Sequence, residues 1–132
     1  MADKVDLLAH LPLFAALEER SMQAVAALAR EVAAPAGTVL MREGEPADSF
    51  YLIVSGVVRV ERAGAAVRSM SDGGFLGEIA LVEQGTRTAT ATCATDCRLI
   101  MLGSFEFERV MATFPEVRAR IGAAIKRRPH TG

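Results

Sequence analysis

The sequence predicts a mainly β domain flanked by helices, in which the strands form an antiparallel barrel or sandwich. Short apolar or alternating runs recur from Glu31 to about Leu102, and glycines separate them. Many short strands at this spacing are typical of such folds. On both sides of this region, apolar residues return at the helical period of about 3.6 residues. The 132 residues fit one domain, which we place at residues 1–132.

The segment before the strands has the pattern of a helix. Within residues 17–32, Leu17, Val25 and Leu28 fall near one face, and Arg20 lies elsewhere. A stripe of this kind packs against a core. We therefore expect an amphipathic packing helix over residues 17–32.

The central region contains six runs that we expect to be strands. They are TVLMRE (38–43), FYLIVS (50–55), VVRVER (57–62), AVRSM (66–70), TATATC (88–93) and CRLIML (97–102). Gly56 and Gly64 fall where tight turns need a residue that adopts positive φ. The run TATATC alternates Thr with Ala, so one face of that strand should carry hydroxyls and the other methyls.

The C-terminal region is expected to form two helices that meet at a corner near Thr113. Each has its own apolar stripe, namely Phe107, Val110, Met111 and Phe114 on the first and Val117, Ile121 and Ile125 on the second. Basic residues of the second helix lie off its stripe, where charges near a helix C-terminus are favourable.

Composition excludes several classes of protein. Hydrophobic residues make up 51% and charged residues 23%, which supports a packed core, and the net charge of −1 gives no basic field for nucleic acid. No apolar run is long enough to span a bilayer and no signal peptide is evident, so we expect a cytoplasmic protein without a membrane partner. Two cysteines in CATDC and two histidines near the ends predict no metal site and no enzyme. We interpret Cys93 and Cys97 as small apolar residues flanking a turn.

The stretch GFLGEIALVEQGTRTATA (74–91) combines an anion site with an acid. Backbone N–H groups after Gly77 and the planar fork of Arg87 both suit a phosphate. Glu78 would repel a free phosphate, but a carboxylate accepts a hydrogen bond from a ligand hydroxyl. The pattern therefore fits a sugar hydroxyl held beside a phosphate, as in a ribose 3′,5′-cyclic phosphate.

Residues 76–90, LGEIALVEQGTRTAT, resemble the phosphate-binding cassette of cyclic-nucleotide-binding domains. These domains occur in the catabolite activator protein, in regulatory subunits of cyclic-AMP-dependent protein kinase and in cyclic-nucleotide-gated channels. Upstream, GEPADSFYLIVSGVVRV (44–60) resembles the early strands of the family. Leu76 replaces the usual Phe and Thr86 the usual Pro, at positions that pack and stiffen the loop. The resemblance implies an N-terminal helical segment, an eight-stranded antiparallel jelly roll and two C-terminal helices.

The resemblance also implies a ligand site, made of Leu76, Gly77, Glu78, Ile79, Ala80, Arg87 and Thr88. Gly77 and the amides of Ile79 and Ala80 would lie against the phosphate, which Arg87 would pair. Glu78 would accept the ribose 2′-hydroxyl. Thr88 would face the base when guanine binds. The ligand would be cyclic AMP or cyclic GMP, with cyclic AMP favoured as the natural one, and no cofactor is expected.

A C-terminal lid completes the site that the family resemblance implies. Ile125 would pack on the base, and Arg127 or Arg128 would stack on it. Few residues follow Arg128, so we expect no DNA-reading module in this chain, and a protein partner or a missing effector domain to receive the signal. Two alternatives stay open: a sensor truncated from a transcription regulator or another multidomain protein, and a relic of the fold that no longer binds nucleotide.

Overall fold

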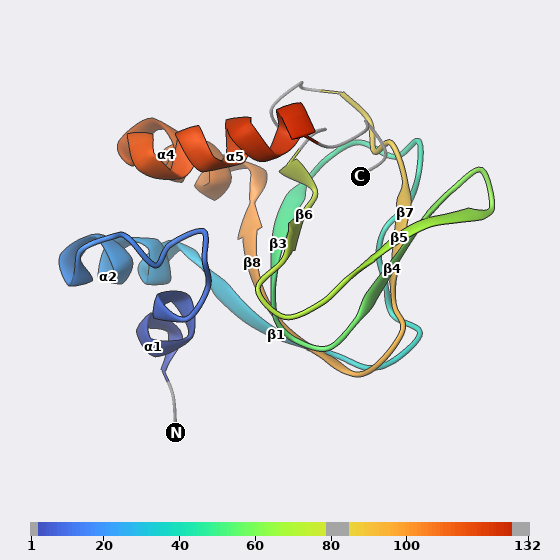
Figure 1. Cartoon of the computed structure of the whole chain (residues 1–132), viewed down its shortest axis with the longest axis horizontal. Coiled ribbons are helices and arrows are strands. Elements are labelled where there is room, and N and C mark those ends of the chain that lie inside the picture. The colour runs from blue at the N-terminus through green and yellow to red at the C-terminus, as the bar shows by residue number, and fades with distance from the viewer. Residues whose placement is uncertain (1–2, 79–84, 128–132) are drawn as a thin grey trace.

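The computed structural model describes residues 3–78 and 85–127 (Figure 1). Two helices come first, α1 (Lys4–Ala9) and α2 (Glu19–Leu28). The strands are β1 (Arg30–Ala34), β2 (Val39–Met41), β3 (Ser49–Ser55), β4 (Val58–Arg62), β5 (Ala65–Met70), β6 (Phe75–Leu76), β7 (Thr90–Cys93) and β8 (Cys97–Gly103). Two further helices, α4 (Ser104–Thr113) and α5 (Pro115–Arg127), follow them.

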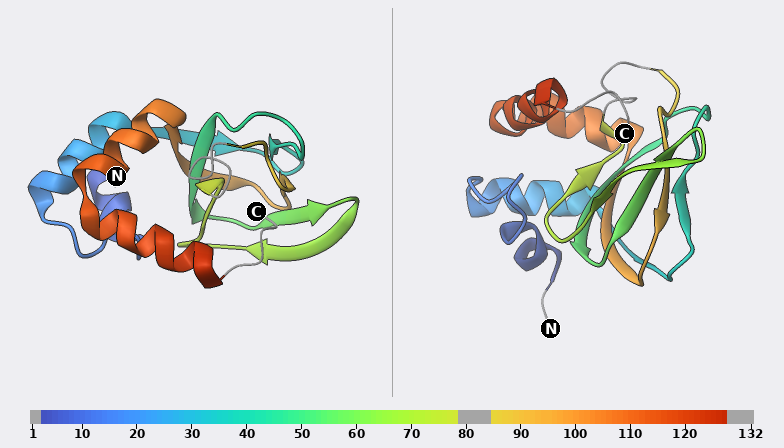
Figure 2. Two further views of the ribbon diagram at one scale, coloured as in Figure 1. Left: turned by 90° about the horizontal axis from the view of Figure 1, so that it is seen from above. Right: turned by 45° about the vertical axis from the view of Figure 1, so that its right-hand side comes forward.

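The strands form two four-stranded sheets, which confirms the predicted fold class. One sheet has the order β1-β8-β3-β6 and the other β2-β7-β4-β5, with every pair antiparallel. The two sheets enclose the barrel, and the helices lie together on one side of it (Figure 2). The predicted helical segments before and after the barrel are thus present, with a turn of α1 that periodicity did not single out.

The predicted helix over residues 17–32 is too long at its C-terminal end. α2 ends at Leu28, and β1 begins at Arg30. Glu31 and Val32 pair with Ile100 and Leu99 of β8. Strand pairing with a distant segment therefore overrides the local helical pattern, because β1 and β8 satisfy each other's backbone groups.

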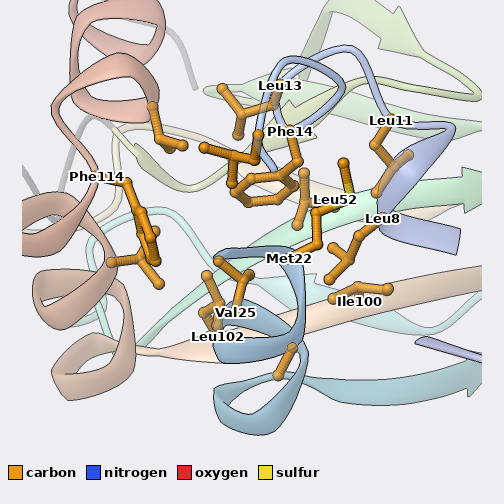
Figure 3. Close-up of a cluster of buried hydrophobic side chains, with 14 of the residues drawn as sticks. Leu8, Leu11, Leu13, Phe14, Met22, Val25, Leu52, Ile100, Leu102 and Phe114 are labelled. Carbon is orange, nitrogen blue, oxygen red and sulfur yellow. The ribbon is translucent and has the colours of Figure 1, made fainter. Parts of the chain in front are cut away.

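The first hydrophobic core lies between the helices and the sheet that contains β3 and β8 (Figure 3). Phe14 and Val25 from the N-terminal segment meet Leu52 of β3 and Ile100 of β8, and all four are fully buried. The stripes of α4 and α5 join them, with Ile121 1% exposed. This packing fixes the helices against the outer face of the barrel.

The second core fills the barrel between the two sheets. Its members include Ile53, Val58, Val60, Leu76 and Leu99. Because β3 and β8 contribute to both cores, their side chains are apolar on both faces, which explains why FYLIVS and CRLIML read as continuous hydrophobic runs.

Two details of the strand prediction are refined by the structure. The Thr/Ala alternation is confirmed, since Ala89 and Ala91 are buried and Thr90 is half-buried. The strand itself is shorter than predicted, because β7 begins at Thr90 and Thr88 lies in a bend before it. The turn glycines behave as expected, with φ of 110° at Gly56 and 81° at Gly64.

Candidate functional site

Gly77 follows β6 directly and turns the chain with a φ of 97°. Glycine adopts this left-handed backbone without strain. A Cβ at this position would lie 2.9 Å from Nη1 of Arg87 and 2.9 Å from the carbonyl oxygen of Ser49. Gly77 is therefore required twice, once for its backbone conformation and once for the close approach of Arg87.

Arg87 lies in the interior with 3% of its surface exposed. Its Nη1 donates a hydrogen bond to the carbonyl oxygen of Gly77 at 2.8 Å, and Nη2 donates to the carbonyl oxygen of Ser49. The carboxylate of Asp48, whose side chain is 86% exposed, lies 3.6 Å from Nη2. The guanidinium thus ties the cassette to the start of β3. A guanidinium has five N–H donors, so these carbonyl contacts leave donors for a ligand.

The backbone of Arg87 is held as firmly as its side chain. Its N–H donates to the carbonyl of Glu45 at 2.8 Å, and its carbonyl accepts from the N–H of Gly44 at 2.8 Å. Next to it, Thr86 forms an isolated bridge with Pro46. The segment 44–46 therefore fixes the position of the Arg87 backbone relative to the barrel.

The site contains a buried acidic side chain, Glu78, and a buried basic side chain, Arg87. Glu78 is completely buried, at 0% exposure. Burial lowers the pKa of the Arg87 guanidinium, while the negative charges of Asp48 and Glu78 act in the opposite direction. An arginine starts from so high a pKa that it stays charged. A carboxylate that accepts and a guanidinium that donates are thereby placed within electrostatic reach of each other.

The structure places the predicted ligand residues unevenly. Leu76 is fully buried in the barrel core, consistent with a packing role, and Thr88 is half-buried beside Arg87. Ile79 and Ala80 lie outside the described residues, as does Arg128. Glu78 has helical backbone and is the last described residue before Gly85.

The proposed lid segment coincides with the end of α5. Ile125 is half-buried and packs against the first core, and Arg127 is the last residue of the helix; its side chain is outside the described part of the chain. Arg120, about two turns before Arg127, donates from Nη1 to the carbonyl oxygen of Pro12. α5 therefore rests on the N-terminal segment in this structure.

Sequence reasoning missed Asp48 and Ser49 as neighbours of Arg87. They lie 39 and 38 residues away in the chain, and no local motif links them to the cassette. A cavity of about 130 Å³ adjoins them, and it is lined by Val39, Leu40, Met41, Arg42, Glu45, Pro46, Asp48 and Arg87. The only sequence signal near these two residues is the start of the strand at Ser49, where the backbone comes to lie against Arg87.

Metal-binding clusters and membrane-spanning helices are both absent from the described part of the chain. Within residues 3–78 and 85–127, no three His, Cys, Asp or Glu side chains gather as a metal site would require. Over the same ranges, no helix has the length and apolar character that crossing a bilayer demands.

Comparison with known proteins identifies the family. Residues 31–114 match the family described as cyclic nucleotide-binding domain. The chain is 36% identical over 112 residues to the human potassium/sodium hyperpolarization-activated cyclic nucleotide-gated channel 3, covering 85% of this chain and 14% of that protein. It is 33% identical over 123 residues to a cyclic nucleotide-gated potassium channel of Rhizobium etli, covering 92% and 34%.

A solved structure gives the same result. The N-terminal domain of a transcriptional regulator from Streptomyces coelicolor superposes with a TM-score of 0.72 at 31% identity, covering 92% of this chain and 91% of that one. The chain thus spans 14% and 34% of the two channels and 91% of the Streptomyces coelicolor domain. From the matched region, the barrel and the relatives together, the chain belongs to the cyclic nucleotide-binding domain family.

Proposed function

We propose that this domain is a receptor for a 3′,5′-cyclic purine nucleotide, cyclic AMP or cyclic GMP, and that it has no catalytic role. The observation that carries the proposal is the buried contact of Arg87 with Gly77, within electrostatic reach of Glu78. A phosphate needs the guanidinium and the adjacent N–H groups, and a ribose 2′-hydroxyl needs the carboxylate. A cyclic nucleotide presents both groups on one rigid ring.

We further propose that ligand binding moves α5, and that an effector receives this movement. The effector is a further domain or a separate partner protein. The channel relatives support this reading, because in each of them the matched region is a minor part of a longer protein. A second candidate, the sensor of a transcription regulator, is supported by the similarity to the Streptomyces coelicolor domain.

Calorimetric titration of the chain with cyclic AMP and cyclic GMP tests the proposed receptor function. Truncating one partner of a buried charge pair costs about 2–5 kcal/mol, so Arg87→Ala should weaken binding at least tenfold. Arg87→Lys keeps the charge but loses the fork, and should also bind weakly if the fork matters. The control is Arg98→Ala, which removes an exposed guanidinium paired with Glu31 at the surface.

The role of Glu78 is tested with the 2′-deoxy ligands. The wild type should bind them more weakly than the ribo ligands, and Glu78→Gln should narrow that difference because an amide oxygen is a weaker acceptor. Equal affinity of the wild type for ribo and deoxy ligands would contradict the role of Glu78. Failure of the folded wild type to bind either nucleotide would instead identify the chain as a relic of the fold.

A further inference from the structure

Cys93 and Cys97 stand on either side of the turn that joins the two sheets. Cys93 is the last residue of β7, which belongs to one sheet, and Cys97 is the first residue of β8, which belongs to the other. Only three residues separate the two cysteines. The turn lies at the far end of both strands from α4 (Figure 1). The chain therefore leaves one sheet at the first cysteine and enters the other sheet at the second.

The strand register directs both cysteine side chains into the barrel. Cys93 pairs with Val58 of β4, and Cys97 pairs with Ala34 of β1. Directly opposite residues project from the same face of a sheet, and both of these partners are buried in the barrel core. The cysteines belong to the same core, with 1% of Cys93 and 4% of Cys97 exposed. Two thiols from opposite sheets thus project into one end of a single apolar core.

The surroundings of Cys97 hold its sulfur close to Cys93. The thiol of Cys97 donates a hydrogen bond to the carbonyl oxygen of Val57 at 3.5 Å, and the next residue, Val58, is the partner of Cys93. A Cβ on Gly56 would lie 2.7 Å from this sulfur, so glycine leaves the space that the sulfur occupies. Burial, and then hydrogen bonding with Cys97, raise the pKa of Cys93 to about 12. The two sulfurs are therefore within hydrogen-bonding reach of each other.

Cys97 also borders a cavity at the surface of the barrel. The cavity has a volume of about 380 Å³, and its lining includes Ser55, Asp96, Cys97 and Arg98. Asp96 and Arg98 are exposed, so the cavity opens to solvent. Cys93 is not among the lining residues. Cys97 is therefore the thiol that a small solute reaches first, and Cys93 lies behind it.

A pair of adjacent thiols has two common uses, in a metal site or in a disulfide. A structural zinc site needs four ligands, and within residues 3–78 and 85–127 no third His, Cys, Asp or Glu side chain joins the pair. We propose that Cys93 and Cys97 form a reversible redox site, in which a low-molecular-weight disulfide oxidises the two thiols to an intramolecular disulfide that links the two sheets. This inference concerns the barrel alone and does not depend on the binding of a cyclic nucleotide.

The oxidation is a double thiol–disulfide exchange that consumes one molecule of the small disulfide. The Cys97 thiolate attacks one sulfur of that molecule, so that a mixed disulfide forms, the original S–S bond breaks and one small thiol leaves. The Cys93 thiolate then attacks the Cys97 sulfur and expels the second small thiol. The two cysteine protons end on the two released thiols, and the two electrons that the cysteines lose reduce the small disulfide. Because the raised pKa of Cys93 leaves little thiolate, the second step should be the slower one.

The experiment equilibrates the full chain with mixtures of glutathione and glutathione disulfide, once without denaturant and once in urea. Acid stops the exchange, and alkylation of the unfolded chain followed by mass spectrometry counts the free thiols. Oxidation of the folded chain should leave no free thiol and no bound glutathione, with a mass about 2 Da below that of the reduced chain because two hydrogens are lost.

The folded structure should favour this disulfide over the same bond in the unfolded chain. A cross-link that closes so short a loop is expected to lower the equilibrium constant for unfolding about thirtyfold. In a thermodynamic cycle, the effective concentration of the two thiols is then higher in the folded chain than in urea by the same factor. Urea unfolding of the oxidised and reduced chains, followed by circular dichroism, gives the first factor, and the glutathione titrations give the second. The two factors should agree.

Single substitutions test the order of the two steps. Cys93→Ala should stop at the mixed disulfide, with one glutathione on Cys97 that dithiothreitol removes. Cys97→Ala should take up glutathione only after urea exposes Cys93. Uptake by folded Cys97→Ala as fast as by Cys93→Ala would contradict entry of the oxidant through the cavity.

Three results with the wild type would overturn the proposal. One is a folded chain that keeps two free thiols at glutathione ratios that oxidise the unfolded chain. Another is a mixed disulfide that persists at equilibrium in the folded chain, which would show that the two sulfurs cannot join. The third is an oxidised chain that unfolds at a lower urea concentration than the reduced chain, because the bond would then belong to the unfolded state. None of these results bears on the proposed receptor function.

Discussion

Substitution of Gly77 by alanine tests whether the site depends on the close approach of Arg87. Alanine in a left-handed conformation costs about 1–2 kcal/mol. The new Cβ would also stand 2.9 Å from Nη1 of Arg87 and from the carbonyl oxygen of Ser49. Relieving that contact displaces a hydrogen bond from a charged donor, which costs about 1.5–3 kcal/mol. We expect Gly77→Ala to lower the free energy of unfolding by about 2.5–5 kcal/mol.

Gly64→Ala is the matched control for this substitution. Gly64 has a φ of 81°, close to the 97° of Gly77, but no atom lies within 4 Å of its added Cβ. Gly64→Ala should therefore lower the free energy of unfolding only by the cost of the left-handed backbone, about 1–2 kcal/mol. Urea unfolding followed by circular dichroism measures both variants, and the midpoint and slope give each free energy.

Equal losses in the two variants would refute the reasoning, because the steric term would then be absent. A double-mutant cycle sharpens the result. In an Arg87→Ala background, the contact between the new Cβ and the Arg87 side chain is gone. The double mutant should therefore lose less free energy of unfolding than the sum of the losses in the two single mutants. Strict additivity would show that Gly77 and Arg87 do not act together.

Three further predictions address the rest of the molecule. Ile121→Ala, in the first core at 1% exposure, should lower the free energy of unfolding by about 2–5 kcal/mol and Ile121→Val by about 0.5–1.5 kcal/mol, and equal effects in urea unfolding would contradict tight packing there. Burial and the neighbouring Cys97 raise the pKa of Cys93 to about 12, so this thiol stays protonated at pH 8 and iodoacetamide should alkylate it slowly until urea unfolds the chain; fast labelling of folded protein, read by mass spectrometry, would be inconsistent with that pKa. If the ligand moves α5, amide hydrogen exchange over Pro115–Arg127 should change on addition of cyclic nucleotide, and an unchanged pattern would leave the helix as scaffold.

The sequence alone carries the local features of this protein. Alternating and apolar runs marked six of the eight strands found in residues 3–78 and 85–127, because side chains in a strand point to opposite faces with a period of two. Gly56 and Gly64 marked turns, since positive φ favours glycine. The spacing of Gly77, Glu78 and Arg87 indicated a site for a phosphate beside a hydroxyl, because each residue type carries the required donor or acceptor.

Tertiary structure decided everything that depends on pairing between distant segments. α2 stops at Leu28 because the following residues are taken up by the β8 ladder, and β6 is a strand of two residues only through its pairing with β3. The carbonyl oxygen of Ser49, which accepts from the Arg87 side chain, belongs to a residue 38 positions earlier in the chain. Arg68 belongs to the expected strand AVRSM, and its register opposite Val60 is what shows that it faces the barrel interior. Local periodicity gives the two faces of a strand, but which face is buried is set by the neighbouring strands, whose contacts lie far away in the chain.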